Sequence, residues 1–387
     1  MQRGPTGTHR TSKHGGETVR AFVPAPLPPS PALDLGSTLL QGLERANLAV
    51  GRLDGVSAAL PDTHLFLYTY VRKEALLSSQ IEGTQSSLSE LLLFELDQAA
   101  GAPLDDVVEV SNYVAALDHG LARLRGGFPL SNRLLREIHA KLLQRGRGSD
   151  KLPGEFRRTQ NWIGGTRPGA AHFVPPPPED VAECMQDLER FLHDDDNGLP
   201  ILIRAALAHV QFESVHPFLD GNGRVGRLLI TLLLCHQRQL RDPLLYLSLY
   251  LKQNRDRYYD LLDRVRRDGD WEAWIVFFLE GVEKTATGAV DTATRLMALF
   301  SEHRGQIQLA GRKASSALRV HDALKARPVH RLQDIAASTG LSFPAATAGM
   351  AVLMDLKIAR EVTGKQRNRV FAYDGYLGIL NEGTENL

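Results

Sequence analysis

Residues 201–238 constrain the fold most strongly, because two apolar helical stretches there are separated by a short polar motif. The first stretch is ILIRAALAHVQFES (201–214) and the second covers 224–238. A helix that is apolar on most of its faces has to be buried. We therefore expect these helices to form the central, buried pair of a helical domain. His209 on the first helix is expected to be a hydrogen-bonded core residue.

The motif between the two helices is HPFLDGNGRVGR, residues 216–227, and its residue types suit the handling of a polyphosphate. Asp220 can hold a hard cation through oxygen. The backbone N–H groups of residues 221–223, at the beginning of a helix, can cradle an anion. Arg224 and Arg227 are three residues apart and project to one side, where they can clamp phosphate oxygens. His216 can accept a proton. The alternative is an ordinary helix start with glycines in the turn.

The motif matches the signature of the Fic family, HPFx(D/E)GNGRxxR, at every fixed position, and the chain resembles that family. The resemblance implies an all-α fold, a Fic-type helical bundle, that transfers AMP from ATP to a Ser, Thr or Tyr hydroxyl of a target protein. It implies that His216 is the catalytic base and that Asp220 coordinates Mg²⁺. The other residues that it places at the nucleotide are Gly221, Asn222, Gly223, Arg224 and Arg227, with Asn222 at the α-phosphate and the arginines at the departing pyrophosphate.

A second motif, SSQIEG, covers residues 78–83 at the end of a helical stretch. Gly83 suits a helix C-terminus, which places Glu82 in the last turn. A carboxylate there opposes the helix dipole and needs a cationic partner. The motif resembles the inhibitory pattern (S/T)xxxE(G/N) of Fic proteins, with Ser78, Glu82 and Gly83 at its fixed positions. By this resemblance Glu82 pairs with Arg227 and withholds it from the γ-phosphate of ATP. The alternative is a solvated glutamate beside a helix end.

Residues 154–178 interrupt the helical pattern with two short extended segments, around 161–163 and 172–174, joined by a Gly-Pro-rich turn. The segment is either a surface loop or an edge to which an extended peptide could add. It resembles the β-hairpin flap that aligns the target hydroxyl in Fic enzymes. Ile163, Gly164 and Gly165 would then contact nucleotide or target. Tyr258 and Tyr259 resemble a tyrosine pair beside the nucleotide in related proteins; by themselves they indicate one buried and one exposed helix aromatic.

The remaining sequence suggests four regions. Residues 1–35, rich in Gly, Thr, His and Pro, are expected to be a flexible N-terminal arm. An N-terminal helical region that carries the inhibitory helix follows at 36–110, with a helical pattern to Gln98 and a capping box at Ser87 and Glu90. The catalytic core is predicted at 111–290 and ends with helices at 251–266 and 271–284. The fourth region, 311–375, has a different composition.

This C-terminal region holds eleven Lys and Arg against four Asp and Glu over residues 311–373. Its pattern predicts helices at 315–325, 332–338 and 343–356, then strands at 358–362 and 370–373 with a basic segment at 364–369 between them. This order resembles a small winged helix-turn-helix domain, which places a helix in the major groove of DNA. The alternative is use of the same fold for protein contacts or dimerisation.

Composition limits the partners. The 45 basic residues balance the 45 acidic ones, so no global charge favours nucleic acid or membrane. Two cysteines, no apolar run of eighteen residues and no signal peptide indicate a cytoplasmic protein without membrane contact. The expected partners are ATP and a target protein, which could be the chain itself, and a homodimer fits the family. Two other functions remain open: removal of AMP from a modified target on the same site, and a DNA-binding regulator whose Fic core senses nucleotide.

Overall fold

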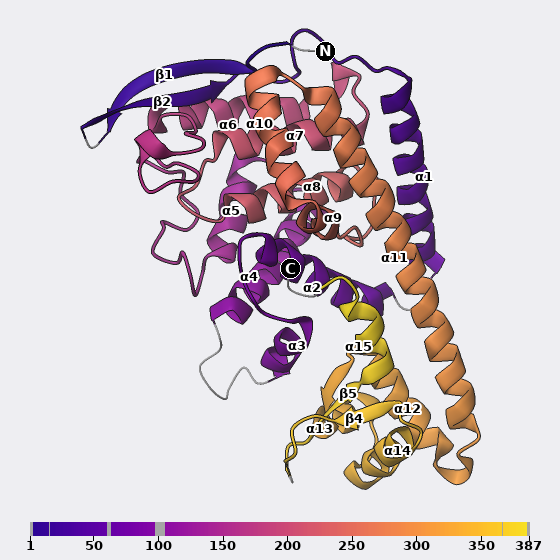
Figure 1. Cartoon of the computed structure of the whole chain (residues 1–387). Coiled ribbons are helices and arrows are strands. Elements are labelled where there is room, and N and C mark those ends of the chain that lie inside the picture. Colours follow the sequence, from indigo (N-terminus) through magenta and orange to yellow (C-terminus); the bar gives the residue numbers. More distant parts are fainter. Residues whose placement is uncertain (1–2, 15, 60–62, 97–104, 366, 385–387) are drawn as a thin grey trace.

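The two apolar helices expected at 201–238 are α7 (Ile201–Val215) and α8 (Asn222–His236), and both are buried along nearly their whole length. The computed structural model describes residues 3–14, 16–59, 63–96, 105–365 and 367–384, which are mostly helical with two small antiparallel sheets (Figure 1). The predicted all-α class with small β elements is therefore confirmed. His209 is a core residue, as expected, because Nδ1 lies 3.0 Å from the Gly226 carbonyl and Nε2 lies 2.8 Å from the Tyr258 hydroxyl.

Helices that precede this pair in the sequence and helices that follow it pack against it. Ser87 and Glu90 form the predicted capping box at the start of α3, where each backbone N–H contacts the other side chain. The predicted end of that helical stretch at Gln98 lies outside the described residues. The helices of this part of the chain are α1 (Ser37–Ala59), α2 (Thr63–Ile81), α3 (Leu88–Leu96), α4 (Asp105–Arg125), α5 (Asn132–Leu142), α6 (Pro178–His193), α9 (Ser248–Gln253) and α10 (Arg255–Asp268). Of these, α2, α4, α5, α6 and α10 contact α7 or α8.

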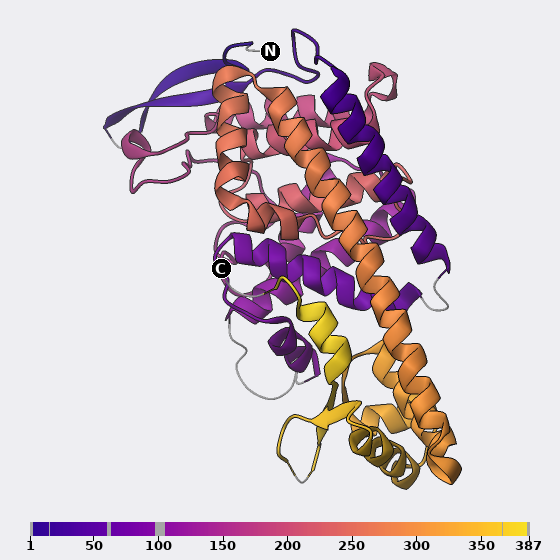
Figure 2. The same ribbon diagram turned by 45° about the vertical axis from the view of Figure 1, so that its right-hand side comes forward.

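The helix predicted at 271–284 is much longer, because α11 spans Trp271–Gln308. Its first part packs beside α1, and its second part continues past the end of α1 to the C-terminal region (Figures 1 and 2). No proline interrupts it, and the small residues Ala286, Ala289 and Ala293 are buried on one face, so close packing continues past the predicted stop. The predicted core boundary at 290 therefore falls inside a continuous helix.

The N-terminal arm expected to be flexible over 1–35 contains an antiparallel hairpin, and that prediction was wrong. Strand β1 (Gly7–His14) pairs with β2 (Glu17–Pro24). Val19, Ala21 and Phe22 of β2 are buried, and the Arg3 guanidinium is held by Glu272 of α11 at 2.6 Å. Averaging the composition over 35 residues hid this short apolar segment, which is buried by other parts of the chain.

The C-terminal region has the elements that its pattern predicted, α12 (Ala314–Ala326), α13 (Leu332–Thr339), α14 (Phe343–Asp355), β4 (Ala359–Glu361) and β5 (Val370–Tyr373). The sequence missed β3 (Val329–Arg331), which completes a sheet of order β3-β5-β4, and α15 (Asp374–Asn381). Gln366, in the predicted basic segment, lies outside the described residues. No single described helix is long and apolar enough to cross a membrane. The helices α13 and α14, which are bent by 113° at the break between them, reach that length and apolar composition only when they are taken together.

The end of the described chain returns to α2, the helix that precedes Glu82 (Figure 2). The Lys73 ammonium donates to the Glu382 carbonyl at 2.8 Å, and the Gln80 amide donates to the Thr384 carbonyl at 3.1 Å. The hydroxyls of Thr69 and Tyr376 lie 3.3 Å apart. One face of α2 thus contacts α15 and the residues that follow it.

Candidate active site

The polar motif forms the end of α7, a tight loop and the beginning of α8. His216 ends α7 in a left-handed conformation (φ 48°), with its N–H bonded to the Phe212 carbonyl. Gly221 precedes α8 with φ 75°, a conformation that glycine adopts without strain. The first N–H groups of a helix lack intrahelical acceptors and carry the positive end of its dipole. The loop therefore presents an anion-binding helix start close in sequence to an imidazole.

Internal hydrogen bonds fix the shape of this loop. The Asn222 side chain accepts from the Phe218 N–H and donates to the Phe218 carbonyl, both at 2.8 Å. His139 of α5 stacks on the Phe218 ring with centroids 3.8 Å apart, and its Nε2 lies 3.0 Å from the Asp220 carbonyl. Both polar atoms of the Asn222 side chain are used to close the loop, and the placement of Asn222 at the α-phosphate stays a prediction. Its backbone N–H still belongs to the helix start.

His216 is placed to act as a base. Its side chain is about one-fifth exposed, at 19%, while burial and the neighbouring Arg157 lower its pKa below the ordinary value. The imidazole is therefore neutral near pH 7 and can accept a proton. Arg157 also fixes the backbone here, since its Nε donates to the His216 carbonyl at 2.9 Å and its Nη2 to the Pro176 carbonyl at 2.6 Å. The sequence pattern did not single out Arg157.

The predicted pair between Glu82 and Arg227 is present. Glu82 Oε1 accepts from Arg227 Nη2 at 2.7 Å, and Ser78 accepts from the same guanidinium through its hydroxyl at 2.8 Å and its carbonyl at 2.9 Å. The Arg227 side chain is 2% exposed and that of Glu82 33%. Burial alone would raise the pKa of Glu82, but Arg227 overrides it and lowers the pKa, so the carboxylate is ionised at neutral pH. Acidification through this lowered pKa would remove the pair.

The way in which α2 ends explains how the Glu82 carboxylate reaches the beginning of α8. The helix ends at Ile81, so Glu82 lies in the turn directly after it rather than in the last helical turn. Gly83 continues that turn with φ 101°. The Glu82 carboxylate lies so close to Gly223 that a β-carbon at position 223 would collide with it. The carboxylate thus covers the first turn of α8, the place predicted to cradle an anion.

Arg224, the other arginine of the motif, is held by a residue that the sequence pattern did not identify. Its Nη1 lies 3.0 Å from Glu109 of α4, and both side chains are at most 3% exposed. The only signal in the sequence was one acidic residue within the otherwise apolar run VVEV of a helix. Each arginine of the motif is therefore paired with a carboxylate from the N-terminal helical region.

Substitution of Glu109 by glutamine should lower both the stability of the protein and its activity. Glutamine keeps the size and an acceptor oxygen but leaves Arg224 only the more distant and partly exposed carboxylate of Asp220, at 3.6 Å, which costs about 1–3 kcal/mol. We expect the melting temperature to fall by roughly 2–6 °C in differential scanning fluorimetry. Glu183→Gln on the exposed face of α6 is the matched control and should melt like the parent. Equal melting of both variants would show that Glu109 does not neutralise Arg224.

Asp220 suits a hard cation that arrives with a substrate. Its Oδ1 accepts from the Gly221 N–H at 2.6 Å and lies 3.6 Å from Arg224, and its side chain is 27% exposed. No group of three or more His, Cys, Asp or Glu side chains in the described parts of the chain is arranged to hold a metal ion by itself. One accessible carboxylate fits Mg²⁺, which usually takes one or two carboxylates and completes its shell with water and substrate phosphates.

The segment predicted to be a flap has the expected form. Ile163 and Phe173 form an antiparallel bridge, and Gly164 and Gly165 turn the chain with φ near 70°. Asn161 ties the base of the flap to the motif, because its amide donates to the Phe218 carbonyl at 3.0 Å. The flap, residues 161–174, therefore lies directly beside the loop between α7 and α8.

The two tyrosines of α10 differ in accessibility, as the helix pattern predicted. Tyr258 is 1% exposed and its hydroxyl contacts His209, whereas Tyr259 is 40% exposed. The structure therefore offers only the Tyr259 ring to a ligand, and Tyr258 forms part of the support behind Arg227.

Comparison with known proteins agrees with this fold and site. Residues 40–122 match the family described as Fic/DOC family N-terminal, and residues 129–234 match the Fic/DOC family. The described architecture resembles the crystal structure of a Fic family protein from Desulfovibrio desulfuricans G20, with a TM-score of 0.58, 20% identity and coverage of 88% of this chain and 97% of that one. The fold and the site thus define a Fic-type protein, and through residues 40–234 the chain belongs to the Fic/DOC family.

Curated relatives are named protein adenylyltransferase Fic. The chain is 33% identical over 208 residues to that protein from Drosophila grimshawi, covering 53% of this chain and 40% of the relative. It is 34% identical over 246 residues to the one from Culex quinquefasciatus, covering 60% of this chain and 46% of the relative. The chain therefore spans less than half the length of these relatives.

Proposed function

We propose that this protein transfers AMP from ATP to a hydroxyl group of a target protein, and that the structure represents its inhibited form. The observation that carries the proposal is the Glu82 carboxylate, which covers the start of α8 and binds Arg227. A carboxylate in that position makes the contacts that a phosphate group would make. The names of the curated relatives support AMP as the group transferred.

The geometry supports an in-line displacement at the α-phosphorus. The neutral His216 imidazole would take the proton of a Ser, Thr or Tyr hydroxyl as its oxygen bonds to the α-phosphorus. The bond from the α-phosphorus to the bridging oxygen breaks, and pyrophosphate leaves with that oxygen. His216 is held by Arg157 and the loop by Asn222, so little rearrangement is needed at the reacting end of the site.

Charge on the triphosphate would be stabilised by three features of this chain. The N–H groups at the start of α8 and the guanidinium of Arg224 would face the phosphates, and Arg227 would join them once Glu82 moves away. Asp220 is the residue that would hold Mg²⁺. When bound, Mg²⁺ supplies neutralisation of phosphate charge. The exposed ring of Tyr259 is available beside this site to stack on the adenine ring of ATP.

Incubation of the full chain with Mg-ATP, followed by intact-mass and peptide mass spectrometry, tests the proposal directly. We expect an AMP adduct on a Ser, Thr or Tyr of the protein itself, weak for the parent and strong when Glu82 is replaced by glycine. A control with the α,β-bond of ATP replaced by a non-cleavable link should give no adduct. If neither form gains AMP, and the parent instead releases AMP from a modified protein by attack of water on the α-phosphorus, removal of AMP is the main activity.

The structure gives less support to a role in DNA binding. The order α12, α13, α14, β4, β5 agrees with the element order on which that prediction rested. However, α14, which would enter the groove in such a module, contains no Lys or Arg, and Phe343 and Met354 are its exposed large side chains. Phosphate contacts would then depend on the basic segment between β4 and β5. DNA binding stays a prediction that a mobility shift assay can test.

A further inference from the structure

The N-terminal hairpin packs against the flap and holds it at both of its ends. At the base, the Phe22 N–H donates to the Val174 carbonyl at 2.9 Å, and Val19 and Ala21 form a small apolar cluster with Val174, Trp162 and Ala171. At the tip, Glu17 of β2 pairs with Arg167 and accepts from the Gly169 N–H at 3.2 Å. Strand β2 is therefore part of the support of the flap, although it is far from it in sequence.

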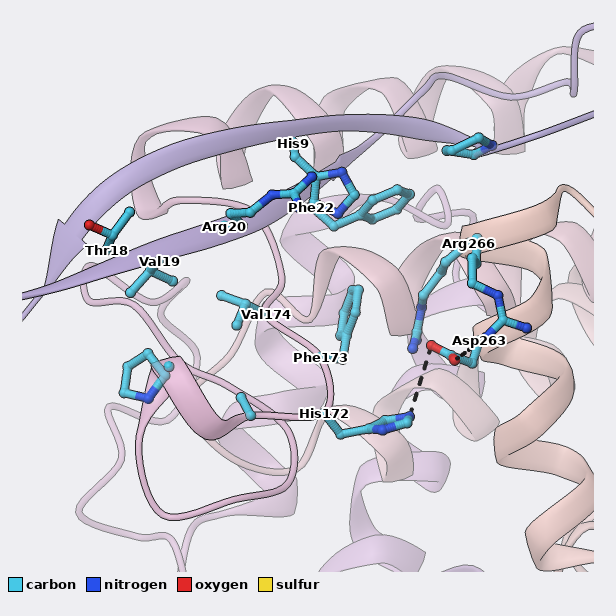
Figure 3. Close-up of a pocket in the computed structure, with 15 residues that line it drawn as sticks. His9, Thr18, Val19, Arg20, Phe22, His172, Phe173, Val174, Asp263 and Arg266 are labelled. Atoms are coloured by element: carbon cyan, nitrogen blue, oxygen red, sulfur yellow. Dashed lines mark ion pairs between the residues drawn. The ribbon is translucent and has the colours of Figure 1, made fainter.

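A cavity of about 480 Å³ lies between this hairpin, the flap and α10 (Figure 3). Phe22 and Phe173 form its apolar wall, with ring centroids 6.0 Å apart. Its charged side chains are Arg20 from the hairpin and Asp263, Arg266 and Arg267 from α10. The cavity is thus partly apolar and partly charged, as expected for a site that receives one side chain and the backbone beside it.

The cavity is directly connected to the reaction site through Arg266. The guanidinium of Arg266 lies 3.9 Å from the centre of the Phe173 ring. Its Nε donates to the Ser214 hydroxyl at 3.1 Å and its Nη2 to the Glu213 carbonyl at 3.3 Å. These two residues form the last turn of α7 just before His216. A segment lying in the cavity would therefore be close to the catalytic imidazole and would contact the flap.

The charges around the cavity favour an anionic occupant. Three arginines and one carboxylate, Asp263, line the cavity, and Asp263 lies 3.9 Å from His172 (Figure 3). Arg267 is already paired, with Asp268 at 3.0 Å and Asp263 at 3.7 Å, so the positive charge left for an occupant comes from Arg20 and Arg266. Within the described residues, Arg20 forms no ion pair and its side chain is exposed on the strand. A carboxylate entering here would gain a partner without displacing an existing ion pair.

We propose that the N-terminal hairpin and the flap together form the docking surface for the target protein, and that the cavity receives an Asp or Glu side chain located near the hydroxyl to be modified. This inference rests on the proposed AMP transfer. It assigns Arg20 a role in selecting substrates, because Arg20 is the exposed cation at the hairpin side of the cavity.

The test compares two peptide libraries in the full-length Glu82→Gly protein with labelled ATP. Each library contains Ser, Thr and Tyr acceptors in peptides of equal length; one carries Asp and Glu at the flanking positions and the other carries Asn and Gln. We expect kcat/KM to be roughly fivefold or more higher for acidic peptides, mainly through KM. Arg20→Glu should reduce this ratio to near unity, and Arg20→Lys should retain most of it.

The matched control is Lys13→Glu, which makes the same charge change on the same hairpin at an exposed residue that does not line the cavity. It should keep the preference for acidic peptides. If the protein labels itself but shows no preference for acidic peptides, or if Arg20→Glu and Lys13→Glu behave alike, the docking surface is refuted while AMP transfer stands. If it labels neither itself nor any peptide, the proposed function fails as well.

Discussion

The Glu82→Gly variant is expected to transfer AMP about 10- to 100-fold faster than the parent protein. The substitution removes the carboxylate from Arg227 and from the space above Gly223, so that both become available to the triphosphate. A fully buried pair would be worth more, but one-third of the Glu82 side chain is exposed and solvent screens part of the interaction. The measurement is the initial rate of labelled AMP incorporation at saturating Mg-ATP.

Two further variants separate the ion pair from a general loosening of the turn. Gln85→Gly places glycine at an exposed position in the same loop and should leave the rate unchanged. Glu82→Gln keeps the shape and loses the charge, so its rate should lie between those of the parent and Glu82→Gly. An increase in Gln85→Gly as large as that in Glu82→Gly would show that flexibility, rather than release of Arg227, controls the rate.

Replacement of His216 by alanine in the Glu82→Gly background should reduce AMP transfer by about 10²- to 10⁴-fold, the usual contribution of a general base. The imidazole makes few structural contacts: its Nδ1 lies 4.0 Å from Glu213, and the backbone at 216 is held by Arg157 instead. The fold and the binding of ATP should therefore survive. The measurements are the transfer rate, the melting temperature and the affinity for Mg-ATP by calorimetry.

His119→Ala is a suitable control for the loss of a histidine, because His119 pairs with Glu137 at the surface, away from the motif. In the same Glu82→Gly background, His119→Ala should transfer AMP at the rate of Glu82→Gly alone. Transfer that persists in His216→Ala together with native melting would mean that another group accepts the proton. The buried Glu213, whose pKa burial raises to about 7, would then be the first residue to examine.

Much of the catalytic loop could be predicted from the sequence because its residues are adjacent in the chain. The spacing of His216, Asp220 and the two arginines already determines how they can face a helix start. The pairing of Glu82 with Arg227 required a motif, since nothing in local sequence physics brings residues so far apart into contact. Both predictions concern positions where the residue type suits the backbone conformation that the structure requires; Gly83, for example, has a positive φ, which glycine adopts without strain.

The parts that could not be predicted depend on contacts between distant segments. In the sequence, Glu109 is a single acidic residue in an apolar part of a helix. Its role becomes visible only in the structure, where α4 packs beside α8 and Glu109 pairs with Arg224. The N-terminal hairpin lacks enough apolar residues to fold alone, and it packs on the flap, α6 and α7, which order it. Asn222 shows a related limit, because its side chain could serve either a ligand or its own loop, and only the three-dimensional structure distinguishes the two.

The attachment of the last described residues to α2 makes the proposed inhibition depend on two regions that are distant in the sequence. Residues 376–384 contact Thr69, Lys73 and Gln80 on the helix whose end carries Glu82. Any movement of that helix that releases Arg227 must also strain these contacts. By linkage, a ligand that favours the attachment of residues 376–384 opposes such a movement of α2, and a nucleotide that moves α2 weakens the attachment by an equal amount.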